Sequence, residues 1–273
     1  MSTAARTPLT PLSPLSPHIL DNPAWASLSG PHAAFAEQPG SRSGRSGHPL
    51  RPGHPGRSVH AARYAPDVAP FAALADPSDP RSWAALHELV GPGEVVSLTG
   101  LPTPPEGWET VDAIEAVQLV DTALRAEPAP GAVRLGPDDV PEILALIELT
   151  KPGPFLPRTV ELGTYLGIRH QGRLVAMAGE RLRPPGWTEI SAVCTHPDHR
   201  GGGLATRLVR AVAAGIRDRG DVPFLHAAAR NTAAIRLYES MGFTLRRRPF
   251  FLALRTPCDP GYTAAKFSSY ARH

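Results

Sequence analysis

The sequence predicts a mixed α/β fold in which helices flank a central β-sheet, and three observations support this prediction. Short apolar runs that are typical of strands alternate with amphipathic helical segments between about residue 64 and residue 256. Three consecutive glycines, Gly201 to Gly203, follow one such strand and open a helix with a single apolar face. Residues 1–63 are instead rich in Pro, Gly, Ser and Arg, and we expect them to form a largely disordered N-terminal tail.

The composition favours a soluble, cytoplasmic protein. With 273 residues, of which 42% are hydrophobic, the chain can bury one large core or two small ones. Its formal charge of +3 is too small to indicate a nucleic-acid partner. No apolar run approaches the ~20 residues that cross a bilayer, so no membrane partner is expected, and the N-terminus lacks the apolar segment of a signal peptide. The two cysteines, Cys194 and Cys258, cannot build a disulfide framework or a cysteine-based metal site.

Four regions are expected along the chain. In the tail, the first prolines recur at every third position, a polyproline-like spacing that fits a partner ligand or, preferably, a solvated segment. Within the tail, Ile19–Ala36 contains Trp25 and Phe35, and docking of this segment on the body is the alternative to disorder. The remaining regions are a small α/β segment at 64–130, the main α/β domain at 131–256 and a C-terminal tail at 257–273.

Periodicity places the elements of both globular regions. In the first region, we expect a helix at Asp79–Val90 and strands at Val68–Leu74, Glu94–Leu98 and Ala116–Val120. This region contains no motif that indicates catalysis or ligand binding, and it ends in a linker at Ala126–Pro130. In the second region, helices begin near Asp138, after Gly203 and at Asn231. The strands expected there are Ala132–Leu135, part of Thr159–Ile168, Gly172–Leu182, Thr188–Thr195, Pro223–Ala229 and Phe250–Leu254.

The turn from Arg200 to Ala205 is a candidate anion site. Consecutive glycines at a helix N-terminus let backbone N–H groups approach a phosphate, and the helix dipole adds positive potential there. The turn lacks the third glycine of a dinucleotide fingerprint and the Gly-Lys-Ser/Thr of a Walker loop. Taken alone it fits a plain strand-to-helix turn, so its interpretation depends on a second motif downstream.

That second motif completes a family pattern. Residues 132–255 resemble the GNAT superfamily of acyl-CoA-dependent N-acetyltransferases, whose signatures read Arg/Gln-x-x-Gly-x-Gly/Ala and Asn-x-x-Ala-x-x-x-Tyr-x-x-x-Gly-Phe. The resemblance implies a GNAT fold, acetyl-CoA as co-substrate and no metal. Some members of the family carry a partial, non-catalytic copy of the domain ahead of the working one, so residues 64–130 are a candidate for such a half. The matching positions are Arg200, Gly203 and Ala205, then Asn231, Ala234, Tyr238, Gly242 and Phe243.

The resemblance also implies roles for individual positions. One backbone N–H of the strand, that of Val193 or Cys194, would face the thioester carbonyl and stabilise the negative charge that develops on its oxygen. Asn231 would contact the coenzyme arm, a role that is compatible with capping a helix. The pyrophosphate would be held by backbone amides of Gly201, Gly202, Gly203, Leu204, Ala205 and Thr206, and the pantetheine arm by the backbone of Val193, Cys194 and Thr195.

Tyr238 and Glu189 are the candidate catalytic residues. A phenol with a pKa of ~10 keeps its proton at neutral pH and can pass it from Tyr238 to a departing thiolate whose thiol pKa is ~8.5. Glu189 lies eleven residues before Arg200, where the histone-modifying branch of the family places its general base. Removing a proton from an alkylamine at neutral pH costs roughly 4–5 kcal/mol, so a base or a water relay is valuable. The alternatives are a core aromatic for Tyr238 and, for Glu189, an ion pair with Arg181 or Arg183.

Other residues invite weaker interpretations. Glu180 is a second candidate base. His226 lies on the strand that would face the coenzyme groove, where it fits a lining residue of the acceptor pocket or, preferably, a strand histidine with satisfied hydrogen bonds. His196 and His199 lie in a turn and lack the spacing of metal ligands on one helix. Cys194 lacks a Cys-His-Asn arrangement and fits a small buried residue better than a nucleophile.

The expected function is transfer of an acetyl group from acetyl-CoA directly to an amine, without a covalent enzyme intermediate. The acceptor is expected to be a small molecule, and the chain a monomer or a homodimer. The alternatives are a protein N-terminal or lysine acetyltransferase and a non-catalytic acyl-CoA-binding regulatory module.

Overall fold

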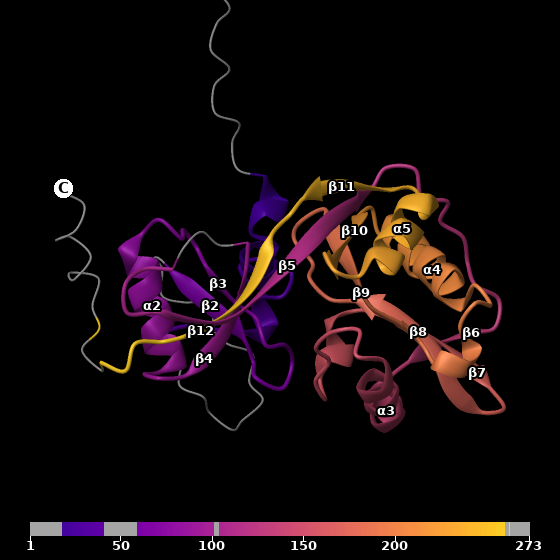
Figure 1. Ribbon diagram of the computed structural model, residues 1–273, viewed down its shortest axis with the longest axis horizontal. Coiled ribbons are helices and arrows are strands. Elements are labelled where there is room, and N and C mark those ends of the chain that lie inside the picture. The colour runs from indigo at the N-terminus through magenta and orange to yellow at the C-terminus, as the bar shows by residue number, and fades with distance from the viewer. Residues whose placement is uncertain (1–17, 41–58, 101–103, 260–261, 263–273) are drawn as a thin grey trace, which may run out of the picture.

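The computed structural model describes residues 18–40, 59–100, 104–259 and 262 (Figure 1). Most of the proline- and glycine-rich stretches of the predicted tail lie outside the described residues, as does most of the segment expected as a C-terminal tail. No helix of the described part of the chain is long and apolar enough to span a bilayer.

One large mixed sheet dominates the described residues. The β9–β10 pair is parallel and the other paired strands are antiparallel, so this is the mixed central sheet that the sequence predicts. β11 (Phe243–Arg247) pairs with β5 beside the main path of the sheet. The order along that path is β4 (Val95–Thr99), β12 (Phe250–Arg255), β5 (Glu109–Asp121), β10 (Val222–Ala228), β9 (Trp187–Thr195), β8 (Arg173–Glu180), β7 (Tyr165–His170) and β6 (Ala132–Leu135).

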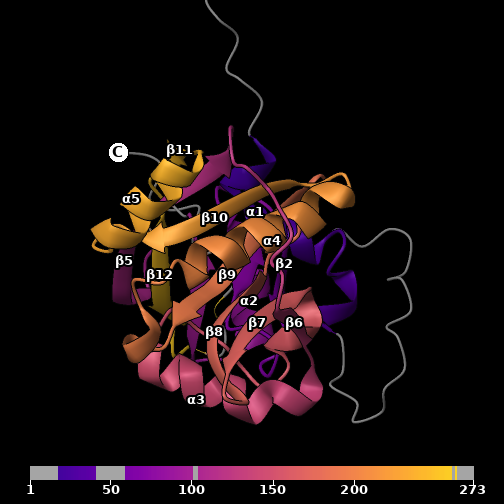
Figure 2. The ribbon, with the colours of Figure 1, turned by 90° about the vertical axis from the view of Figure 1, so that its right-hand side faces the viewer.

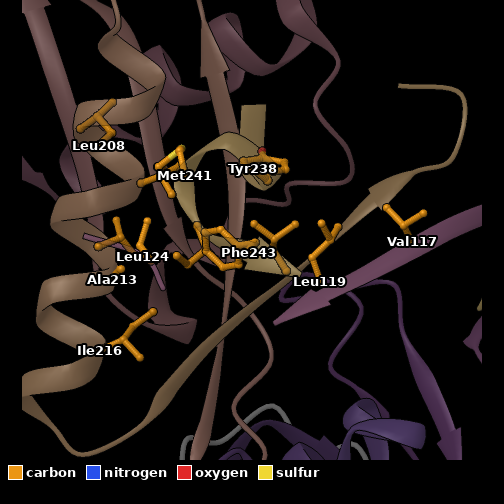
Figure 3. Close-up of a cluster of buried hydrophobic side chains, with 14 of the residues drawn as sticks. Val117, Leu119, Leu124, Leu208, Ala213, Ile216, Tyr238, Met241 and Phe243 are labelled. Atoms are coloured by element: carbon orange, nitrogen blue, oxygen red, sulfur yellow. The ribbon is translucent and has the colours of Figure 1, made fainter. Parts of the chain in front are cut away.

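Two helices cover opposite faces of strands β8 and β9 (Figure 2). Because successive strand residues point to opposite faces, Ala176 and Ala178 pack under α4 (Leu204–Asp218), whereas Met177 packs under α3 (Val140–Thr150). The core beneath α4 also receives Leu119 from β5 and Phe243 from β11 (Figure 3).

Helix α5 (Thr232–Met241) completes this core and ends at Gly242. Gly242 adopts a φ of 104°, and a Cβ there would lie 2.5 Å from the carbonyl carbon of Ala123. The predicted end of the helix is therefore confirmed, and both its left-handed backbone and its close packing require glycine.

The N-terminal segment differs from its prediction. Residues 18–40 lie within the tail that was expected to be disordered, yet they form α1 (Pro23–Leu28), two short 3-10 turns and β1 (Ala36–Glu37). Leu20 and Leu28 are fully buried in a cluster with Leu182 and Phe224 of the main body. For this segment the expectation of disorder is therefore wrong and the alternative, docking of Ile19–Ala36 on the body, is confirmed. Its few apolar residues gain enough burial by packing against another part of the chain.

Strand β5 joins the two halves of the molecule into one sheet. Its first residues pair with β12, and the residues from Ala116 onward pair with β10 and β11. β12 in turn reaches β4, so the last strand of the chain lies in the N-terminal half. In Figure 1, β5 and the β11–β12 ribbon run side by side between the two halves. The small sheet of β1, β2 (Ala61–Tyr64) and β3 (Ala72–Leu74), together with α2 (Pro80–Val90), covers the N-terminal end.

Most predicted elements are present, with four differences. β2 begins within the predicted tail, and only Ala72–Leu74 of the strand expected at Val68–Leu74 forms a strand, β3. The strand expected at Ala116–Val120 is the end of a 13-residue strand, and β11 has no counterpart in the prediction. The first half of β5 mixes polar and apolar residues on both faces and is mostly exposed, so no alternation of apolar and polar residues marks it.

Candidate active site

A cleft opens where two parallel strands part. The pairing of β9 with β10 ends at Ile190 and Leu225, although β9 continues to Thr195 and β10 to Ala228. A cavity of about 1090 Å³ lies beside the separated ends and reaches the N-terminal half. Backbone groups of β9 that would otherwise bond β10 therefore become available to a ligand.

A β-bulge in β9 sets the direction of these backbone N–H groups. Ala192 has a φ of 52°, which is unusual for a residue other than glycine. Between Ser191 and Cys194, β9 has two residues where the paired stretch of β8 has one, so β9 carries one extra residue there. His196 donates its N–H to Val175 of the neighbouring strand, and Cys194 pairs with Met177 there. Because N–H directions alternate along a strand, the N–H of Val193 points to the side of the cleft.

The glycine turn lies at one end of the cleft and has the geometry of an anion site. Gly201 and Gly203 have φ values of 81° and 74°, and a Cβ at either would meet nothing within 4 Å. Gly203 caps α4 without any side-chain hydrogen bond, so the first N–H groups of the helix have no side-chain partner. The residues present therefore fit a pyrophosphate.

The predicted coenzyme residues divide into two sets. Val193, Cys194, Thr195, Ala205 and Asn231 line the cleft, together with Arg200, whose Nε donates to the Thr195 carbonyl at 3.3 Å. The others lie at the start of α4 and outside the cleft lining: Gly201, Gly202, Gly203, Leu204 and Thr206.

Helix α5 carries Asn231 and Tyr238 to the cleft wall. The Asn231 side chain accepts the Ala234 N–H at 3.2 Å and so caps the helix. Tyr238 is 8% exposed and lines the cleft, and its hydroxyl makes no hydrogen bond to another described residue. Burial raises the pKa of Tyr238 to about 12, so the phenol holds its proton across the physiological range.

Glu189 lies beneath the cleft, fully buried, and is not part of the cleft lining. Arg181 donates hydrogen bonds to both carboxylate oxygens of Glu189, from Nε at 2.9 Å and from Nη2 at 2.7 Å. The Leu182 N–H and His226 Nδ1 add two further contacts. These positive and donor groups outweigh burial and hold the pKa of Glu189 far below its ordinary value, so it is ionised. The ion pair with Arg181 that the sequence offered as the alternative is therefore present.

The contacts of Gln118 fix the tautomer of His226. The Gln118 amide oxygen accepts from Arg246 at 2.6 Å, so its nitrogen faces the Leu20 carbonyl at 2.9 Å and His226 Nε2 at 3.0 Å. His226 Nε2 therefore accepts this hydrogen bond, and Nδ1 carries the proton that is donated to Glu189. A buried polar chain thus runs from Arg181 to Arg246.

Several other candidates lack the surroundings of catalytic groups. Glu180 is buried against Arg219 at 2.8 Å and does not line the cleft. Burial raises the pKa of the Cys194 thiol to about 11, which fits a small core residue and not a nucleophile. His196 and His199 contact each other edge to face in the turn before the glycines. No His, Cys, Asp or Glu cluster in the described ranges could hold a metal ion.

Sequence reasoning missed the wall that the N-terminal half contributes. Phe71 and Phe251 line the cleft with ring centroids 6.2 Å apart, and Ser97 and Asp112 lie on the same side. These residues come from a loop and three strands far apart in the chain. No local motif could have identified them, because their proximity is created by the pairing of β12 with β4 and β5.

Comparisons with known proteins identify acetyltransferases among the relatives of this chain. The family model described as "FR47-like protein" matches residues 165–252. A mycothiol acetyltransferase of Thermobispora bispora is 42% identical over 83 residues, which are 30% of this chain and 27% of that protein. The RimI N-alpha-acetyltransferase of Mycobacterium tuberculosis is 39% identical over 90 residues, which are 31% of this chain and 56% of that protein. The matches thus span about a quarter and about half the length of these two curated relatives.

A solved structure matches nearly the whole chain. The protein, from Novosphingobium aromaticivorans and assigned to the GNAT family of acetyltransferases, is 39% identical, with a TM-score of 0.73. The match covers 87% of this chain and 98% of that one, so it includes the N-terminal half. A Drosophila protein shares the fold at 14% identity, with a TM-score of 0.54.

Proposed function

Because the chain belongs to the GNAT family of acetyltransferases, we propose that it transfers an acetyl group from acetyl-CoA to the amine of a small molecule. The observation that carries the proposal is the cleft at the parting of β9 and β10. It is lined by the bulged strand and Tyr238 at one end and by aromatic residues of the N-terminal half at the other. Such a cleft can bring two substrates together end to end.

The coenzyme end would be held mainly by backbone. When bound, acetyl-CoA supplies the activated acetyl group as a thioester. N–H groups at the start of α4 would bind its pyrophosphate, because they lack other partners and the helix dipole attracts anions. The N–H of Val193 would donate to the thioester oxygen, and Asn231 and Arg200 would border the coenzyme arm.

Tyr238 would supply the proton for the departing sulfur. Its pKa of about 12 keeps the phenol protonated, so the hydroxyl can donate a hydrogen bond to the departing sulfur. Because a thiol with a pKa of ~8.5 is the stronger acid, full transfer of the proton is uphill by itself, and it would be coupled to cleavage of the C–S bond and loss of the amine proton. The absence of another hydrogen-bond partner among the described residues leaves this hydroxyl available.

Removal of the amine proton involves Glu189, which we propose acts through His226. Four donors already occupy the Glu189 oxygens, so direct acceptance of a proton would displace one of them. His226 lines the cleft, and its Nδ1–H bond to an ionised carboxylate would stabilise a proton taken up at Nε2. Gln118 would have to release Nε2, which costs about 1 kcal/mol for a neutral hydrogen bond.

The test is acetyl transfer followed by mass spectrometry. The protein would be incubated with acetyl-CoA and a panel of small amines, peptides with free α-amines and peptides with blocked N-termini and a lysine. Reactions without acetyl-CoA and with a heat-denatured protein serve as controls. Acetylation of small amines supports the proposal, whereas coenzyme binding with no acetylated product from any amine would contradict it and support the regulatory-module alternative.

The similarity to RimI favours one second candidate, a protein N-terminal acetyltransferase. The same panel separates it from the main proposal. Acetylation confined to peptide α-amines would support this candidate, and acetylation confined to the lysine peptides would support a lysine acetyltransferase.

A further inference from the structure

We infer that the acceptor carries a carboxylate, which binds Arg181 in the part of the cleft that the N-terminal half lines. The inference rests on the proposed function, because it names the chemical class of the amine. It depends on three features of the described residues: the contacts of Arg181, the aromatic walls beside it and the charges that line the cleft.

Arg181 has one nitrogen left to donate. Its Nε and Nη2 are committed to Glu189, whereas Nη1 makes no hydrogen bond to any described residue. The side chain is 10% exposed, and it lines the cleft. A buried guanidinium is costly unless its donors are satisfied, so an unused terminal nitrogen beside a cavity indicates an oxygen-bearing ligand.

Two contacts hold the Arg181 guanidinium at the cleft wall. Its central carbon lies 5.0 Å above the centre of the Phe71 ring, and the Glu189 carboxylate fixes its opposite edge. The His226 ring packs against Phe251 at 5.3 Å on the neighbouring wall. The guanidinium is therefore oriented before any ligand arrives, which lowers the entropy cost of binding one.

The charges that line the cleft favour an anionic group over a cationic one. Glu189 is fully buried behind Arg181 and does not line the cleft, so the ligand meets the guanidinium and not the carboxylate. Among the described lining residues the basic side chains are Lys151, Arg181, Arg200 and Arg230, and the single carboxylate is Asp112. Arg200 lies at the coenzyme end, next to the glycine turn, whereas Arg181 lies between Phe71 and Glu189. A carboxylate is the group whose geometry a guanidinium edge matches, through charge-assisted hydrogen bonds.

The experiment compares acceptors that differ only in this group. Para-aminomethylbenzoate is paired with para-aminomethylbenzamide, and gamma-aminobutyrate with gamma-aminobutyramide. In the aromatic pair the tested group is separated from the amine by a ring, so the amine pKa is nearly the same in both members. We expect kcat/KM for the acid to exceed that for the amide by about tenfold or more in at least one pair.

Arg181 variants then test whether Arg181 causes the preference for the acid over the amide. Because Arg181→Gln alone would leave Glu189 buried without its partner, the informative variant is the double change Arg181→Gln with Glu189→Gln. The ratio of acid to amide should fall to about one in this variant, whatever happens to its absolute rate. Arg248→Gln is the matched control, since Arg248 is exposed, does not line the cleft and should keep the wild-type ratio.

Calorimetric titration of the same compounds onto the protein with bound coenzyme A distinguishes failure of the carboxylate inference from failure of the proposed function. Turnover of acids and amides at equal efficiency overturns the carboxylate inference and leaves the proposed function standing. Absence of turnover, with acids still binding more tightly than amides, supports the inference and contradicts the proposed function. Equal binding within both pairs, or binding of neither member, overturns the inference. An acid preference that survives the double variant overturns the assignment to Arg181.

Discussion

At the scale of single residues, the site combines groups whose ionisation is fixed by their surroundings: burial for Tyr238, and charged and hydrogen-bonding partners for Glu189. Tyr238 is kept protonated by its surroundings, and Glu189 is kept ionised by Arg181 and His226. Each therefore has a defined charge across the physiological range, and the effect of replacing it can be stated.

Replacing Tyr238 by Phe removes only a hydroxyl. We expect kcat to fall by ~10²–10⁴-fold, because the proton for the departing sulfur is needed only in the transition state. Coenzyme affinity should stay near the wild-type value, since the hydroxyl makes no hydrogen bond to a described residue. Steady-state kinetics and calorimetric titration of coenzyme A measure both quantities. A fully active Tyr238→Phe protein would remove the acid role.

Replacing Glu189 by Gln should affect stability and catalysis together. Arg181 would become a buried charge without its partner, a change that typically costs ~3–5 kcal/mol in the free energy of unfolding. If Glu189 acts through His226, kcat/KM should fall more for an alkylamine than for an α-amine, because the alkylamine, with a pKa of ~10.4, holds its proton more tightly.

The measurement for Glu189→Gln is a pH–rate profile with both amine classes, beside a urea titration of the same protein. The double change Arg181→Gln with Glu189→Gln is the stability control, and it should recover much of the lost free energy of unfolding. A folded single variant whose profile matches the wild type in height and shape would leave Glu189 with a structural role only.

His32 should make the stability of the protein dependent on pH. It is 3% exposed, its Nδ1 lies 2.9 Å from the Tyr64 hydroxyl, and burial lowers its pKa from 6.5 to about 4. Between these values the unfolded chain binds a proton that the folded chain does not. The stabilisation is therefore complete above pH 6.5 and is lost as the pH falls toward 4, by up to about 3 kcal/mol.

Urea unfolding across this pH range, for the wild type and for His32→Gln, isolates the contribution of His32. The variant should lose less free energy of unfolding on acidification, because its side chain does not titrate. Parallel pH dependences of the two proteins would show that His32 does not contribute.

At the scale of elements, the start of α4 and the bulge of β9 create the coenzyme end. Gly203 precedes the helix with a φ of 74°, a conformation that residues other than glycine adopt at a cost. An aspartate there would add strain and a negative charge where the pyrophosphate is proposed to bind.

We therefore expect Gly203→Asp to weaken coenzyme A binding by about tenfold or more. Calorimetric titration measures the affinity, and Gly203→Asn is the matched control, because it adds similar strain without the charge. A larger loss for aspartate than for asparagine supports the anion site. Wild-type affinity in both variants would contradict it.

At the scale of the whole molecule, the shared strand β5 predicts that the two halves unfold together. Leu28 of the N-terminal segment and Leu208 of α4 are both fully buried, in different clusters. Truncating either to alanine should cost ~2–5 kcal/mol in the free energy of unfolding. Since β5 pairs with strands of both halves, we expect a single transition in each case.

Urea titrations followed by tryptophan fluorescence and by far-UV circular dichroism provide this measurement. Three of the four tryptophans, Trp25, Trp83 and Trp108, lie in the N-terminal half and Trp187 lies on β9, so fluorescence is weighted toward the N-terminal half. Circular dichroism reports on all helices and strands. Leu149→Ala is the control, because Leu149 is 51% exposed and its truncation should change the free energy by less than ~0.5 kcal/mol. Separate transitions for the two probes would show that the halves are independent.

The sequence by itself determined the features that local chemistry encodes. The glycine turn, the Asn231 cap, the end of α5 at Gly242 and the strand before the turn each depend on residues close together in the chain. The family pattern is made of these local features, which is why the mixed α/β fold could be predicted.

Only the tertiary structure decided which residues meet across long distances. The docking of residues 18–40, the exchange of strands through β5 and β12, and the wall of Phe71 and Phe251 all join segments far apart in the chain. The same holds for Glu189: the sequence could not choose between a base and an ion pair, because the choice depends on His226 and Arg181 converging on one carboxylate. Burial and pairing are properties of the folded arrangement, and they set the charge, the orientation and hence the chemistry of each group.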